Sequence, residues 1–158
     1  MMRRVDREES ERFARELFAT CDWSVLSTTG PDGPYAVPVS HVVEGNRIYF
    51  HCALEGTKLD CIEFDKRVSL TCVGHVEPDP AALSLFYRSA IARGNASIVT
   101  DEQEKQHALK LIVTRHAPSN SDHVSEHIAQ NMAMTCVVCV TVTHYTSKAR
   151  KKKNVGPV

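Results

Sequence analysis

Residues 34–58, PYAVPVSHVVEGNRIYFHCALEGTK, decide the fold, because they read as two strands, a tight turn and the start of a helix. The segment from Tyr35 to Val43 alternates and is rich in Val, which is typical of a strand. The Gly and Asn of residues 44–46 tolerate the positive φ that a short hairpin turn requires. Residues 47–52, RIYFHC, are β-branched and aromatic, and they predict the returning strand.

The end of this stretch carries groups that hold a phosphate. Residues 53–58 leave the second strand with free backbone N–H groups, the Thr57 hydroxyl and the Lys58 ammonium at the start of a helix. The Gly-Thr-Lys sequence lacks the spaced glycines of a nucleoside-triphosphate loop, so a Walker-type site is not indicated. The alternative is an ordinary helix start with a solvated lysine.

Length and charge favour one cytosolic domain. The chain has 158 residues and a formal net charge of zero, so neither disorder nor a nucleic-acid partner is indicated. No apolar run is long enough to cross a bilayer, and the charged N-terminus does not resemble a signal peptide. The basic run from Lys148 lacks aromatic partners, and we interpret it as a frayed, solvated end.

The six cysteines are expected to be reduced in a cytosolic chain. Cys136 and Cys139 form a CxxC motif, which is found in zinc and redox sites. They lie in a β-branched segment, however, where an offset of three residues places side chains on opposite faces of a strand. We therefore predict buried apolar cysteines at these positions and no metal site.

The remaining pattern predicts six strands with short helices around them. Pro38 cannot donate to a strand ladder and marks an edge or a bulge, and Gly94 marks a bulge or bend. Thr100 and Gln103 are expected to form the capping box of a long helix. Because the connections are short, the strands should pair antiparallel in a small closed or split barrel. The predicted strands are 23–28, 35–43, 47–52, 68–76, 86–99 and 134–145.

The sequence resembles the pyridoxamine 5′-phosphate oxidase-like flavoproteins, and among them the group that includes the nitroimidazole-resistance proteins. The resemblance covers residues 10–150 and is strongest in PYAVPVS (34–40), IYFHCALEGTKLD (48–60) and YRSAIARG (87–94). It implies a mainly β (α+β) fold: a six-stranded antiparallel split β-barrel of Greek-key type with flanking helices. It also implies a homodimer that binds FMN between its subunits. The FMN-binding domain would span residues 1–150, followed by a basic, disordered tail over residues 151–158.

The resemblance implies one cofactor site built from three segments of the chain. Val39 and Ser40 would contact the isoalloxazine edge, His51, Cys52 and Ala53 would lie under the ring and ribityl chain, Thr57 and Lys58 would hold the phosphate, and Arg88 and Ser89 would reach the flavin from a neighbouring strand. Residues of the partner subunit would complete the pocket.

The chain departs from true pyridoxamine phosphate oxidases at two places. Thr57 stands where they carry an Arg, and the end of the chain, KARKKKNVGPV, lacks their Arg-rich substrate segment. We therefore expect an FMN-dependent oxidoreductase that reduces a small electrophile, such as a nitro-heterocycle, with NAD(P)H as a transient electron donor. The alternatives are a flavin- or haem-binding sensor or storage protein without turnover, and a dimer that has lost its cofactor.

His51 is the candidate catalytic residue, because it precedes the predicted phosphate-binding turn. It either delivers a proton to the substrate or only hydrogen-bonds the phosphate or backbone. His41 faces the substrate side or solvent in this interpretation. His123 and His127 are four residues apart, which would let them share a metal on a helix, although a charged surface face is the preferred interpretation.

Overall fold

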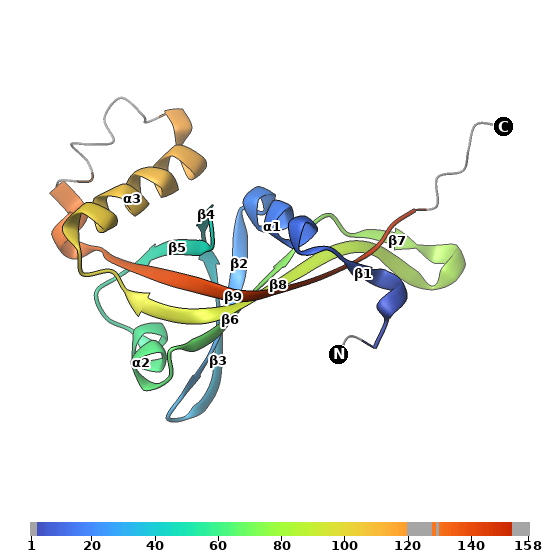
Figure 1. Ribbon diagram of the computed structural model, residues 1–158, viewed down its shortest axis with the longest axis horizontal. Coiled ribbons are helices and arrows are strands. Elements are labelled where there is room, and N and C mark those ends of the chain that lie inside the picture. Colours follow the sequence, from blue (N-terminus) through green and yellow to red (C-terminus); the bar gives the residue numbers. More distant parts are fainter. Residues whose placement is uncertain (1–2, 120–127, 129, 153–158) are drawn as a thin grey trace.

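One antiparallel sheet organises the chain (Figure 1). The computed structural model describes residues 3–119, 128 and 130–152. Within them, nine strands follow the order β3-β2-β6-β8-β9-β5-β4, with β1 paired to β9 and β7 to β8. The strands are β1 Glu8–Glu9, β2 Trp23–Gly30, β3 Gly33–Ser40, β4 Val42–Glu44, β5 Arg47–Cys52, β6 Arg67–Val73, β7 Glu77–Asp79, β8 Ser84–Ile98 and β9 Cys136–Arg150, and the α-helices are α1 Glu11–Thr20, α2 Thr57–Phe64 and α3 Glu102–His116.

The mainly β, antiparallel α+β architecture is confirmed, whereas the prediction of six strands is wrong for this structure. The three additional strands are short: β1 has two residues, and β4 and β7 have three each. Strand β4 arises because the predicted strand 35–43 breaks at His41, after which the chain pairs with β5 instead of β2. Strand β7 lies between the predicted strands 68–76 and 86–99, in a segment where no strand was predicted. Short strands of this kind carry too few residues to show an alternating pattern.

The sheet curls around an inner apolar core. Val39 on β3 and Phe50 on β5 stand near opposite ends of the strand order, yet both belong to this core. Helix α1 contributes Phe18 to it, and α2 contributes Leu59 and Ile62. As predicted from Pro38, β3 is an edge strand, so the missing proline N–H removes no bond to a second neighbour.

Strand β9 separates the inner core from an outer one. Val138 and Val140 face inward, whereas Val137 and Cys139 face outward and pack with Tyr49 and with α3. This division follows from the two-residue period of side chains in a strand. The same strand therefore closes the curled sheet with one face and holds α3 with the other.

A bulge at Gly94 lets β8 and β9 stay paired over their length. The register shifts between Arg93 and Gly94, as expected from the glycine, and the extra residue of the bulge is Thr143 on β9. A Cβ atom at position 94 would clash with the carbonyl oxygen of Thr141 on β9. Glycine is therefore required here for close backbone approach, independently of its φ angle.

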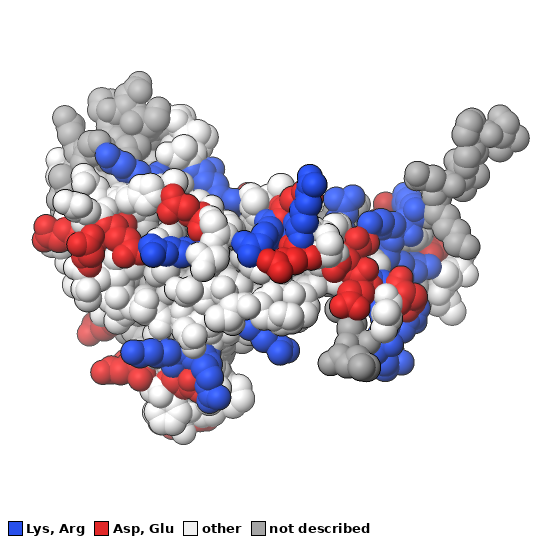
Figure 2. Space-filling model, viewed as in Figure 1, with Lys and Arg blue, Asp and Glu red and all other residues white. Residues whose placement is uncertain are grey.

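Charged residues gather at the end of the molecule formed by β1, β7 and the last part of β9, where Figure 2 shows both signs interleaved. Arg150 pairs with Asp79, Lys151 with Glu9 and Lys152 with Glu77, each at 2.6 Å. The expectation that the chain frays from Lys148 is wrong, because β9 extends to Arg150. Residues 153–158 of the predicted tail lie outside the described residues. No helix among the described residues has the length and apolar character needed to span a membrane.

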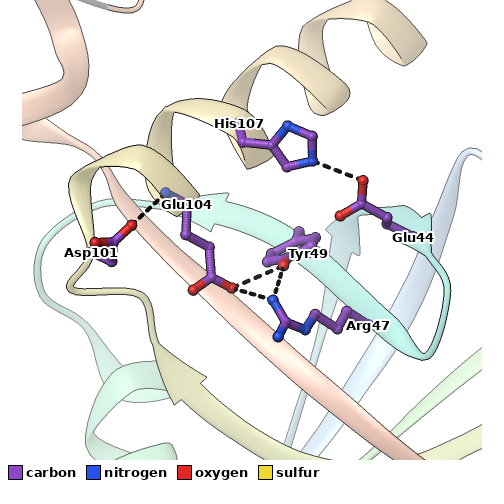
Figure 3. A network of polar contacts seen from close by, with 6 residues as sticks. All are labelled: Glu44, Arg47, Tyr49, Asp101, Glu104 and His107. Carbon is purple, nitrogen blue, oxygen red and sulfur yellow. Dashed lines mark hydrogen bonds and ion pairs between the residues drawn. The ribbon is translucent and has the colours of Figure 1, made fainter.

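A polar network fastens α3 to the β4–β5 hairpin (Figure 3). The Tyr49 hydroxyl donates to Glu104 at 2.9 Å, and Arg47 donates to the same carboxylate at 3.0 Å. One turn further along α3, His107 pairs with Glu44 at 2.8 Å. Tyr49 is fully buried, and this burial raises its pKa to about 12, so the phenol remains a hydrogen-bond donor.

We expect Tyr49→Phe to lower the free energy of unfolding by about 1–2 kcal/mol, because it removes a buried hydrogen bond and leaves the ring packing intact. Urea unfolding measures the change. Tyr35→Phe is the matched control, since no described residue hydrogen-bonds the Tyr35 hydroxyl. Equal midpoints for Tyr49→Phe and the native protein would show that the network does not stabilise the fold.

Candidate functional site

The end of β5 and the start of α2 form the centre of the candidate site. His51 and Cys52 end β5, and Ala53 begins the turn that leads to α2. Gly56 precedes the helix with a φ of 132°, a conformation that L-residues with a side chain rarely adopt. The structure therefore brings together five of the predicted site residues, including Thr57 and Lys58 in the first turn of α2.

The N-terminus of α2 is uncapped, unlike those of the other two α-helices. Ser10 caps α1 and Asp101 caps α3 through side-chain oxygens, whereas no side chain caps α2. The Asp101 cap corrects the expectation of a capping box at Thr100 and Gln103 by one residue.

The first donors of α2 remain available to a ligand. The N–H groups of Leu59 and Asp60 bond to the Gly56 carbonyl, and within the described ranges nothing accepts from the N–H groups of Thr57 and Lys58. Lys58 also forms no ion pair with any residue that the structure describes. Free N–H groups, a hydroxyl and an unpaired ammonium at the positive end of a helix dipole are groups that bind anions, so this turn is a candidate anion site.

His51 lies beside this anion site and remains partly accessible to solvent. Its pKa is lowered from the ordinary value of 6.5, first by burial and then by the positive charges of His116 and Lys58. The imidazole is therefore neutral at pH 7 in the protein without a ligand, and a nearby anion would raise its pKa again.

Helix α3 brings His116, a residue that was not predicted for the site, toward His51. His116 donates from Nε2 to the carbonyl oxygen of His41 at 3.0 Å. Its neighbour Arg115 donates to the carbonyl oxygens of Ala19 and Cys21 at the end of α1. Because these contacts join residues more than seventy positions apart, no local sequence pattern could reveal them.

His41 faces neither substrate nor solvent, which corrects both earlier interpretations. It is fully buried, and its Nε2 donates to the Phe18 carbonyl at 2.9 Å. Burial is the main cause that lowers its pKa to about 4, so the ring is neutral. Its Nδ1 finds no partner among the described residues. His41 is therefore a structural residue that joins α1 to the β3–β4 break.

Val39 and Ser40 end β3 immediately before His41. The Val39 side chain is buried in the inner core, which leaves its backbone as the part able to meet a ligand. The Ser40 side chain is exposed. His116 hydrogen-bonds the His41 backbone at this strand end, and its charge also lowers the pKa of His51. The end of β3 is therefore near His51.

Cys52 points into the inner core opposite Cys136, and burial followed by the Cys136 thiol raises its pKa to about 11. Cys136 and Cys139 are both buried and belong to different cores, as the spacing predicted. No group of three or more metal-ligand side chains occurs within the described residues. His123 and His127 lie outside them.

Arg88 and Ser89 are not brought to the same place as His51 and Lys58 within one chain. Ser89 pairs with Lys148 on β9, whereas His51 pairs with Val137, eleven residues earlier on the same strand. That separation corresponds to about 35 Å of extended strand. Ser89 lines a separate open cleft of about 420 Å³ on the outer face of β8 and β9.

The comparisons with known proteins agree with this fold. Residues 6–149 match the family model described as pyridoxamine 5′-phosphate oxidase. A candidate 5-nitroimidazole antibiotic resistance protein from Bacteroides thetaiotaomicron is 24% identical, with a TM-score of 0.72 over 89% of this chain and 84% of that one. A conserved hypothetical protein from Mycobacterium tuberculosis is 20% identical, with a TM-score of 0.81 over 99% and 98% of the two chains.

An FAD and haem binding protein from Mycobacterium smegmatis is 15% identical, with a TM-score of 0.75 over 92% of this chain and 74% of that one. At these identities the structural likeness shows a shared fold. The chain matches no curated protein.

In the ligand-free protein we expect His51 to titrate below 6.5, and His116→Ala to move its midpoint upward, because a neighbouring positive charge is removed. NMR of the imidazole C–H signals follows the titration. His107→Ala, a change on the same helix beside Glu44, is the control and should leave His51 unchanged. A native midpoint at or above 6.5, or the same shift in both variants, would contradict this environment.

Proposed function

The chain belongs to the pyridoxamine 5′-phosphate oxidase family, and from that premise we propose that it is an FMN-binding flavoprotein that passes electrons from reduced flavin to a small electrophilic substrate. The uncapped N-terminus of α2 is the observation that carries the proposal. The first turn of α2 carries two free N–H groups, the Thr57 hydroxyl and the Lys58 ammonium, and the Lys58 charge lowers the pKa of His51.

This arrangement fits the terminal phosphate of a mononucleotide. A phosphate monoester carries close to two negative charges at neutral pH and presents three oxygens. The N–H groups and the Thr57 hydroxyl donate to those oxygens, Lys58 supplies a charge-assisted contact, and the helix dipole adds to the attraction. Gly56 adopts the φ of 132° with which the chain enters α2, a conformation that suits a residue without a side chain.

A bound flavin supplies the redox chemistry, and the protein positions it and controls protons around it. The lowered pKa keeps His51 neutral until an anion binds. A phosphate dianion then favours the imidazolium, which gives His51 a proton to donate to a reduced substrate. One face of β5 is held by the inner core, and the other face packs against α3. These contacts fix the position of the strand that carries His51.

We further propose a homodimer with the flavin at the subunit interface. One chain holds the phosphate-binding residues about 35 Å of strand away from Arg88 and Ser89. A second copy can bring its Arg88 and Ser89 to the first copy's α2. Val73 and Trp23 on the outer face are more than half exposed, which is apolar surface suited to an interface. A 17.6 kDa monomer that sediments with FMN bound would contradict the dimer.

Electron transfer tests the function directly. We expect the purified protein to show a flavin absorption spectrum, to be reduced anaerobically by NADH or NADPH, and to be reoxidised by a 5-nitroimidazole faster than free reduced FMN. Stopped-flow absorbance measures that rate. Reoxidation no faster than free FMN would contradict the enzymatic role, and haem bands without flavin bands would contradict the cofactor.

We expect Lys58→Ala to weaken FMN binding about ten- to a hundredfold, because a charge-assisted contact to phosphate is worth about 1.5–3 kcal/mol. Titration of flavin-free protein with FMN, followed by flavin fluorescence, measures the affinity. Lys66→Ala removes the same charge just beyond the other end of α2 and is the matched control. Equal affinities for the two variants would remove Lys58 from the site.

A further inference from the structure

Four of the six cysteines lie beside another cysteine. Cys52 on β5 stands directly opposite Cys136 on β9, and Cys21, just after α1, contacts Cys72 on β6. All four are free thiols in this structure. The first pair is of particular interest because Cys52 immediately precedes the turn to α2.

The position of Cys52 and Cys136 meets the geometric requirement for a disulfide. Directly opposed residues of antiparallel strands have Cα atoms about 4.5 or 5.5 Å apart. Disulfides join residues whose Cα atoms are about 4.4–6.8 Å apart, so either value is suitable. Both side chains also point to the same side of the sheet, since Cys136 belongs to the inner core and Cys52 packs against it.

The two thiols differ in accessibility. Cys52 is half-buried, whereas Cys136 is buried with 6% of its surface exposed. A small reagent from solvent therefore reaches Cys52 first. The groups that act on this thiol are Cys136, which raises its pKa, and the Lys58 ammonium on α2, which lowers it; burial is the largest effect, and the net pKa is about 11.

We propose that Cys52 and Cys136 form a redox-active dithiol, which a small-molecule disulfide converts into a cross-strand disulfide between β5 and β9. The Cys52 thiolate attacks one sulfur of the reagent, forms a mixed disulfide and releases one thiol. The Cys136 thiolate then attacks the Cys52 Sγ and releases the second thiol. Two electrons pass to the reagent, and both cysteine protons leave with its two thiols.

The new bond would fix the end of β5 to β9 at the point where the chain leaves the sheet for Ala53 and α2. It closes a loop over residues 52–136, about half of the chain, so it should stabilise the folded state. Because this chemistry needs only the two thiols and the reagent, it does not depend on the proposed flavin.

The raised pKa of Cys52 predicts how the reaction depends on pH. Only the thiolate attacks a disulfide, and at pH 7 a thiol with a pKa of about 11 is almost entirely protonated. The rate should therefore rise about tenfold per pH unit between pH 7 and pH 10. An exposed cysteine with an ordinary pKa would level off near pH 9.

The test treats the reduced full-length protein with oxidised glutathione from pH 7 to pH 10 and maps the peptides by mass spectrometry. We expect a cross-linked pair of peptides containing Cys52 and Cys136, two hydrogens lighter than the free peptides, with the steep pH dependence given above. A lasting glutathione adduct on Cys52 without a cross-link, or an unmodified Cys52, would overturn the proposal. Peptide mapping separates this pair from Cys21 and Cys72.

Two variants complete the test. Cys136→Ala should stop at the glutathione adduct on Cys52, because the resolving thiol is absent. Cys139→Ala removes a buried cysteine of the same strand that faces the other core, and it should still form the cross-link. Circular dichroism verifies that both variants fold. A disulfide between Cys52 and another cysteine in Cys136→Ala would show that a different thiol resolves the adduct and would overturn the assignment of Cys136.

Discussion

The pairing of β9 with its neighbours is the constraint on which the other parts of the structure depend. This strand pairs with β8 on one side, and with β5 and then β1 on the other. Its inward side chains close the curled sheet, and its outward side chains hold α3. A slip of one residue would exchange the two sets, so a single register of this strand serves both cores. The bulge opposite Gly94, whose extra residue is Thr143 on β9, keeps β9 paired with β8 on both sides of it.

Much of this architecture follows from local sequence patterns. The β-branched runs, the edge proline at Pro38 and the turn at Gly45, which has a φ of 60°, correctly indicate an antiparallel sheet. The break at His41 could not be seen in the pattern, because His41 is flanked by valines and serine that suit a continuous strand. Its cause is tertiary: the Phe18 carbonyl and His116 engage His41 from two different helices.

In the candidate site, too, some residues could be predicted from local sequence patterns and others could not. The start of α2 was recognisable, because a Gly-Thr-Lys sequence directly after a strand indicates a helix N-terminus with groups that can bind an anion. His116 was missed, since it meets His51 only after α3 has packed on β5 and β9. Arg88 and Ser89 came from resemblance alone, and the fold places them far along β9 from the rest. Local sequence patterns identify residues whose role depends on their own segment. Long-range packing decides which residues from distant segments come together.

The missing cap of α2 has a thermodynamic consequence. Each of the other two α-helices gains one N-terminal hydrogen bond from a side chain of the same protein, Ser10 in α1 and Asp101 in α3. Under the proposed function, a bound phosphate would supply the missing N-terminal hydrogen bonds of helix α2. Binding and local folding are then linked, and ligand concentration sets the stability of this segment. Without an anion, the N-terminal turn of α2 lacks the side-chain hydrogen bond that the other two α-helices have.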